Sequence, residues 1–145
     1  MCIRDSPNLV ERVEGGLLSY GNEMTRANNP LECNLDRYCC LDGSVEYIGS
    51  EALQRIAETG PMQRIRGVIF DGDPTPPCDS PWTIMAEGKK VGYTTTVVWS
   101  PQLKANLALA MIDSDSWNTG HNVQVETPDG LKRNGAVVDF PVSFL

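Results

Sequence analysis

The sequence predicts an α+β protein, with helical signals in its first part and short β-strands in the rest. Capping residues and apolar residues at helical spacing occur between about residues 7 and 59. From residue 62 onward, short stretches of alternating apolar and polar residues are separated by turn sequences. Strands of this length and spacing are typical of a small barrel or sandwich.

The first expected helix begins at Asn29, which is a suitable N-cap, and Pro30 suits the first helical position. Its apolar face would be formed by residues at helical spacing, namely Leu31, Leu35 and Tyr38 or Cys39.

The second expected helix begins at Ser50, with Glu51 in its first turn. Gly60 and Pro61 end it, because Gly tolerates the left-handed conformation after a helix and Pro cannot continue the hydrogen-bond ladder. The side chains that we expect it to bury are Ala52, Leu53, Ile56 and Ala57.

Six strands are expected after the Gly60-Pro61 boundary. They are residues 64–70, 82–85, 91–99, 107–112, 122–126 and 136–140. The turn at 87–90 predicts a hairpin between the second and third strands. Residues 128–130 and the pair Asn134-Gly135 would join the fifth strand to the sixth.

Composition excludes several classes of protein. The net charge of −7 opposes binding to the phosphate backbone of nucleic acid, and no apolar run approaches the roughly 20 residues that a membrane helix needs. The cysteine count of 5 is odd and no C-x-x-C pair occurs, so we expect neither a metal site nor a disulfide framework. Reduced thiols are typical of a cytoplasmic protein.

Two segments resemble the glycine-cleavage T-protein family of folate-dependent one-carbon transferases. Residues 12–38, RVEGGLLSYGNEMTRANNPLECNLDRY, match a family pattern R-x-E-x-G-x-x-L-Y-G followed by T/N-P-x-E-x-x-L. Residues 92–95, 100–103 and 107–110 match, in order, a pattern of the C-terminal barrel of the family. The two matches together cover almost the whole chain.

The resemblance implies a fold class of α+β, with the C-terminal part of a T-protein-like folate-binding domain followed by a small antiparallel β-barrel. The expected boundaries are 1–6 for a non-native leader, 7–60 for the folate-binding part and 61–145 for the barrel. The first match lies past the middle of family members but begins here at Arg12. We therefore expect a C-terminal fragment that lacks the N-terminal half of its own chain. The family's catalytic aspartate lies in that half, so no catalytic residue is expected here.

The resemblance also implies an activity. The segments LLSYGNEMTR and NNPLEC are most similar in sequence to family members that demethylate dimethylsulfoniopropionate. Residues 71–88 lack the arginine that aminomethyl-transferring members tend to carry in this loop. We expect the parent, a bacterial cytoplasmic enzyme, to pass a methyl group from this small-molecule donor to tetrahydrofolate. The alternatives are an aminomethyltransferase of glycine cleavage, a related sarcosine or dimethylglycine demethylating domain, and a non-catalytic structural fragment. The sequence allows a homo-oligomer, whereas neither nucleic acid nor a membrane is expected as a partner.

Three residues are candidates for binding the tetrahydrofolate. Arg12 matches the family arginine that lies against the folate, and its guanidinium can hold a carboxylate or carbonyl bidentately; the alternative is a surface pair with Glu11 or Glu14. Glu14 would orient Arg12 or cap the turn at residues 15–16, and we favour the supporting role. Tyr20 offers a stacking face for a pterin, although a packed core tyrosine is an equal alternative.

Overall fold

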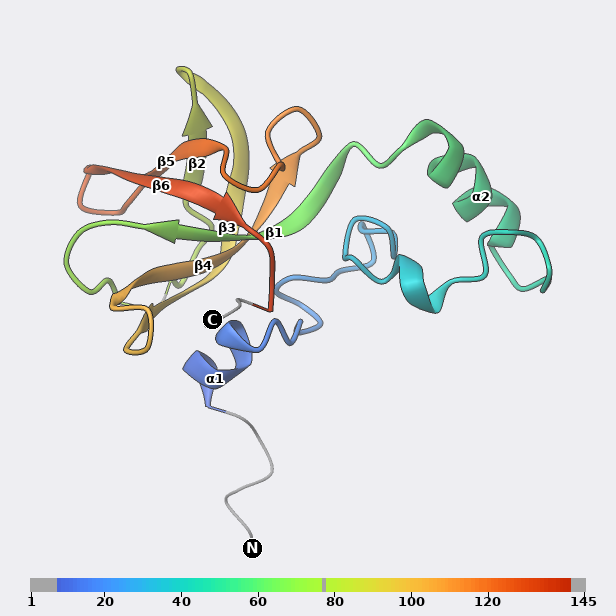
Figure 1. Cartoon of the computed structure of the whole chain (residues 1–145), viewed down its shortest axis with the longest axis horizontal. Helices are drawn as coiled ribbons and strands as arrows, with labels where there is room; N and C mark the ends of the chain where they lie inside the picture. The colour runs from blue at the N-terminus through green and yellow to red at the C-terminus, as the bar shows by residue number, and fades with distance from the viewer. Residues whose placement is uncertain (1–7, 77, 142–145) are drawn as a thin grey trace, which may run out of the picture.

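The computed structural model describes residues 8–76 and 78–141, so the expected leader at 1–6 lies outside the described residues. Its centre is a closed antiparallel barrel, shown in Figure 1, in the order β1-β4-β3-β2-β5-β6. The strands are β1 (Gln63–Phe70), β2 (Thr83–Ala86), β3 (Lys89–Ser100), β4 (Ala105–Asp113), β5 (Asn122–Glu126) and β6 (Lys132–Val138). The strand pattern alone allowed a barrel or a sandwich, and the small antiparallel barrel that the resemblance implies is confirmed.

The barrel interior is filled by apolar side chains from alternate positions of its strands, because successive strand residues point to opposite faces. Trp82, which precedes β2, adds a large ring to this cluster and is buried. The other buried members are Val68, Phe70, Ile84, Ala86, Val97, Ala108, Ala110, Ile112, Val123, Val125 and Val137.

A short helix, α1 (Leu9–Glu14), packs on the outer face of β3 and β4. The Asn8 side chain caps it by accepting a hydrogen bond from the backbone nitrogen of Glu11 at 2.9 Å. Val13 is fully buried in a second apolar cluster with Ile65, Val98, Leu107, Leu109 and Met111. This packing fixes the helix, and therefore its neighbouring Arg12, against the barrel wall.

The first predicted helix is wrong, because residues 30–34 form a hydrogen-bonded turn and not a helix. The side-chain oxygen of Asn29 does accept hydrogen bonds from the backbone nitrogens of Leu31 (3.0 Å) and Glu32 (3.1 Å), as expected of an N-cap. Asn34, however, adopts a φ of 56°, a left-handed conformation that cannot continue this turn into a helix. Its side-chain nitrogen donates to the backbone oxygen of Ile65 at 3.0 Å, so a contact with β1 replaces the helical continuation.

A single 3-10 turn, η1 (Asp36–Tyr38), follows instead. Tyr38 is 72% exposed and Leu35 is half-buried, whereas Leu31 is buried. The apolar face predicted for this segment therefore does not form.

The second predicted helix is confirmed as α2 (Ser50–Thr59), and Gly60 follows it with a φ of 82°. The predicted burial is wrong, since Ala52 and Ala57 are exposed and Leu53 and Ile56 are half-buried. The reason is visible in Figure 1, where α2 lies away from the barrel; within the described residues it makes no extensive contact with another helix or strand. Within residues 8–76 and 78–141, no helix is long and apolar enough to cross a membrane.

The predicted link at Asn134-Gly135 is also wrong, because both residues lie inside β6. A Cβ at Gly135 would lie 2.5 Å from the backbone oxygen of Ile69 and 2.7 Å from the Cβ of Phe70. The glycine therefore allows β6 to approach β1 closely where the barrel closes. An Asn-Gly pair that usually indicates a turn serves here to close the sheet.

Candidate functional site

Arg12 lies in the last turn of α1, and its side chain is only 14% exposed. One terminal nitrogen, Nη1, donates to Oε2 of Glu23 at 2.9 Å and to the backbone oxygen of Leu17 at 2.8 Å. The other, Nη2, donates to Oγ1 of Thr96 at 3.1 Å and to Oε1 of Glu23 at 3.4 Å. The partner of Arg12 is thus a residue that the sequence analysis did not consider.

Glu23 has a fully buried side chain. Its Oε2 accepts from the backbone nitrogen of Ser19 at 2.6 Å, and its Oε1 accepts a short hydrogen bond from the Thr96 hydroxyl. Burial alone would raise the pKa of the Glu23 carboxyl, but the hydrogen bonds from Arg12, Thr96 and Ser19 together hold the pKa below its ordinary value. The carboxylate is therefore ionised at neutral pH and forms an internal ion pair.

A β-bulge in β3 builds the barrel side of this site. Thr94 pairs with Ala110 and Thr96 pairs with Leu109, so the intervening Thr95 has no partner in the ladder. The hydroxyls of Thr95 and Thr96 both lie near Oε1 of Glu23, at 3.4 Å for Thr95. In a regular strand two consecutive side chains would point to opposite faces. The bulge thus brings two neighbouring threonines to one carboxylate.

Glu14 makes no hydrogen bond or ion pair with Arg12 within the described structure, and its carboxylate accepts none from the following turn. Its Oε1 accepts a hydrogen bond from the Ser100 hydroxyl at 2.5 Å, and the Ser100 oxygen accepts from the backbone nitrogen of Leu103 at 3.0 Å. The expectation that Glu14 orients Arg12 directly is therefore wrong. Glu14 instead ties the end of α1 to the turn that follows β3.

Tyr20 is 69% exposed, so the alternative of a packed core tyrosine is wrong. It lies on the same loop as Glu23 and forms an isolated backbone bridge with Met24. A surface hollow of about 600 Å³ opens beside this loop and is lined by residues 15–18, Met24, residues 33–38, Phe140 and Pro141. An aromatic ring is therefore accessible next to the Arg12 network.

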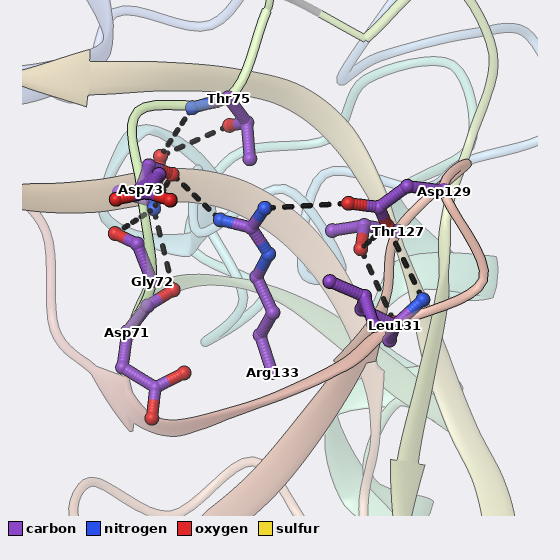
Figure 2. A network of polar contacts seen from close by, with 9 residues as sticks. Asp71, Gly72, Asp73, Thr75, Thr127, Asp129, Leu131 and Arg133 are labelled. Atoms are coloured by element: carbon purple, nitrogen blue, oxygen red, sulfur yellow. Dashed lines mark hydrogen bonds and ion pairs between the residues drawn. The ribbon is translucent and has the colours of Figure 1, made fainter.

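A second polar network, shown in Figure 2, holds the loop that follows β1. Asn106 is fully buried, and its Nδ2 donates to three backbone oxygens, of Asp71 (3.3 Å), Gly72 (3.3 Å) and Asp73 (3.1 Å). Its Oδ1 accepts from the backbone nitrogen of Thr75 at 2.9 Å and from the Thr75 hydroxyl at 3.0 Å. One amide thus bonds polar groups along residues 71–75, the first part of this loop.

Arg133 of β6 reaches the same loop from the other side (Figure 2). Its Nη1 donates to the backbone oxygen of Asp73 at 2.6 Å, and its Nη2 lies 3.5 Å from Oδ2 of Asp129. Hydrogen bonds from the Thr127 hydroxyl and the backbone nitrogen of Leu131 lower the pKa of the Asp129 carboxyl. The loop lacks an arginine in its sequence but receives one from a distant strand.

No group of three His, Cys, Asp or Glu side chains is arranged to bind a metal ion within residues 8–76 and 78–141. Cys33, Cys39, Cys40 and Cys78 are free thiols, and Cys2 lies outside the described residues. Among the sequence candidates, the Arg12 side chain is 14% exposed and Tyr20 is 69% exposed, whereas Glu14 is half-buried and lines a separate hollow of about 520 Å³ beside α1.

The ion pair predicts a pH dependence of stability. The pKa of Glu23 is lower in the folded chain than its ordinary value of 4.5, so its contribution is present above that pH and is lost as the pH falls through the folded pKa. We expect the free energy of unfolding of the native chain to exceed that of Glu23→Gln at neutral pH, and the gap to narrow as the pH falls below 4.5 and through the folded pKa. Urea titrations of both proteins across this range measure the gap, and a constant gap would contradict the expectation.

Comparison with known proteins gives the chain its family. Residues 63–143 match the glycine cleavage T-protein C-terminal barrel domain. The chain is 44% identical over 126 residues to the dimethylsulfoniopropionate demethylase DmdA of Ruegeria pomeroyi, covering 87% of this chain and 34% of that protein. It is 36% identical over 115 residues to an aminomethyltransferase of Synechococcus, covering 79% of this chain and 31% of that protein.

The solved structures add a likeness in fold. The glycine cleavage system aminomethyltransferase T of Bartonella henselae superposes with a TM-score of 0.79 at 20% sequence identity, over 92% of this chain and 37% of that one. The chain thus spans about a third of the length of the curated relatives that it matches. By its matched barrel domain and its fold, the chain belongs to the glycine cleavage T-protein family.

Proposed function

We propose that the chain serves methyl transfer from dimethylsulfoniopropionate to tetrahydrofolate. The observation that carries this proposal is the 44% identity to the demethylase over 87% of the chain, against 36% to the aminomethyltransferase of Synechococcus. The loop at residues 71–88, which contains no arginine, supports the same choice.

The chemistry asks little of the protein beyond placement. A sulfonium is an activated methyl donor, because breaking its carbon–sulfur bond releases a neutral thioether, here methylmercaptopropionate. Bound tetrahydrofolate would supply the nucleophilic nitrogen N5, lose the N5 proton to solvent as the new carbon–nitrogen bond forms, and leave as 5-methyltetrahydrofolate. The protein mainly has to bring the two reactants together and orient them.

The residues of this chain fit such a placing role. Arg12 would contact the folate, and Tyr20, whose ring is exposed on the adjoining loop, would stack on it. Glu23 and Thr96 hold the guanidinium of Arg12, while Glu14 holds the end of α1 through Ser100.

The proposal predicts that Arg12→Ala weakens binding of tetrahydrofolate by about 1.5–3 kcal/mol, the usual range for a hydrogen bond to a charged group. Calorimetric titration of the purified chain measures this. Arg26→Ala is the matched control, because Arg26 is exposed and the described structure gives it no hydrogen bond or ion pair. An equal loss in both variants, or no loss in Arg12→Ala, would count against the assignment of Arg12.

The donor is tested separately by incubating the chain and tetrahydrofolate with dimethylsulfoniopropionate and measuring methylmercaptopropionate. Aminomethyl transfer is the second candidate function, favoured by the aminomethyltransferase relatives. Formation of methylenetetrahydrofolate from an aminomethyl donor, without sulfonium demethylation, would select it. A folded chain that binds no tetrahydrofolate would instead have a structural role.

A further inference from the structure

The guanidinium of Arg12 has little hydrogen-bonding capacity left for a ligand. An arginine carries five N–H donors, two on each Nη and one on Nε. Nη1 uses both of its hydrogens on Leu17 and Glu23, and Nη2 uses both on Thr96 and Glu23. In the described part of the chain no acceptor is bonded to Nε, and Nε is not among the buried nitrogens without a partner. The free donor is therefore the single, accessible Nε–H.

This arrangement excludes the bidentate grip that the sequence analysis allowed for Arg12. A carboxylate fork needs two parallel N–H groups on one edge of the guanidinium. Every edge includes at least one Nη, and both hydrogens of each Nη are already bonded. An incoming carboxylate would therefore have to displace Glu23 or Thr96.

The charge of Arg12 is also compensated from within the chain. Glu23 is fully buried and lies 2.9 Å from Nη1, so the pair together carries no net charge. The Ser19 backbone nitrogen and the Thr96 hydroxyl donate hydrogen bonds to the Glu23 carboxylate from other sides. The ion pair is thus held both by the loop that contains Ser19 and by strand β3 of the barrel.

We propose that Arg12 recognises an uncharged, flat part of its ligand through Nε–H and the face of the guanidinium, and not a carboxylate. This inference rests on the proposed function, and within it the contacted part is the pteridine ring of tetrahydrofolate and not its glutamate tail. Glu23 is then a positioning residue, because it decides which donor Arg12 presents.

The test uses two ligands, tetrahydrofolate and 6-methyltetrahydropterin, which has the reduced ring but no benzoylglutamate. Calorimetry with the native chain and Arg12→Ala should show the same loss for both ligands, about tenfold or more, which corresponds to at least about 1.4 kcal/mol. A loss confined to tetrahydrofolate would show that Arg12 binds the carboxylates and would overturn the inference.

Glu23→Gln tests whether Glu23 positions Arg12, because glutamine keeps the shape of the side chain and removes its charge. With Arg12 uncompensated, tetrahydrofolate binding should become steeply dependent on salt, whereas 6-methyltetrahydropterin binding should not. An unchanged salt dependence for both ligands would contradict the role given to Glu23.

A third measurement separates this inference from the proposed function. Phenylglyoxal attacks free guanidinium nitrogens, and peptide mass mapping gives the rate at each arginine. Arg12 should react at least about tenfold more slowly than the exposed Arg26, because both of its Nη atoms are engaged. Equal rates would overturn the inference even if tetrahydrofolate binds. Slow modification of a chain that binds neither ligand would support the arrangement at Arg12 and overturn the proposed function.

Discussion

Glu23→Ala is expected to lower the free energy of unfolding by about 3–5 kcal/mol, the cost of removing one partner from a buried ion pair. The substitution leaves the guanidinium of Arg12, only 14% exposed, without its counter-charge. It also leaves the backbone nitrogen of Ser19 and the hydroxyl of Thr96 without their acceptor. Urea unfolding followed by tryptophan fluorescence measures the loss.

Glu126→Ala is the control for burial. Glu126 pairs with Lys132 of the neighbouring strand at 3.1 Å, but its side chain is 36% exposed. Solvent screens such a pair, so we expect a change within about 1 kcal/mol. Similar losses in the two variants would mean that the burial of Glu23 does not determine its contribution.

Asn106→Asp is expected to lower the free energy of unfolding by about 3–5 kcal/mol at neutral pH, because several buried polar groups lose their partner at once. An aspartate cannot donate when ionised, and its charged oxygen would lie 3.1–3.3 Å from the backbone oxygens of Asp71, Gly72 and Asp73. The loss should shrink in acid, where the protonated carboxyl can again donate one hydrogen bond.

Asn122→Asp makes the same chemical change at an exposed position of β5. We expect it to alter the free energy of unfolding by no more than about 0.5 kcal/mol, as surface substitutions usually do. A comparable loss at both positions would show that added negative charge, and not the buried network, is responsible.

Most strands could be predicted from the sequence because their residues alternate or, in β4, form a continuous apolar run, whereas the choice of a barrel over a sandwich came from the family resemblance. At the predicted hairpin turn, Glu87 and Gly88 adopt φ values of 50° and 78°. The errors occurred where a tertiary contact overrides a local signal. Asn34 donates a hydrogen bond to β1 where a helix was predicted, and Gly135 lies in a strand because β1 approaches it closely.

The candidate site was only partly predictable. Arg12 was found because it belongs to a recognisable pattern. Glu23 was missed because an acid after Gly21-Asn22 has the local signature of an exposed turn, and only the fold buries it. Thr96 was missed because no local pattern reveals a bulge in β3. Pairwise contacts between distant segments are not encoded in local periodicity.

The bulge at Thr95 makes the site and the barrel separately adjustable. Its extra residue is inserted while the ladder on either side of it continues. Thr94 pairs with Ala110 of the interior cluster and Thr96 pairs with Leu109 of the outer cluster, so deleting Thr95 would leave both facings unchanged. The inserted residue therefore adds one hydroxyl beside Glu23 without disturbing either apolar face of β3, so the polarity of the site can change at this position while the barrel stays the same.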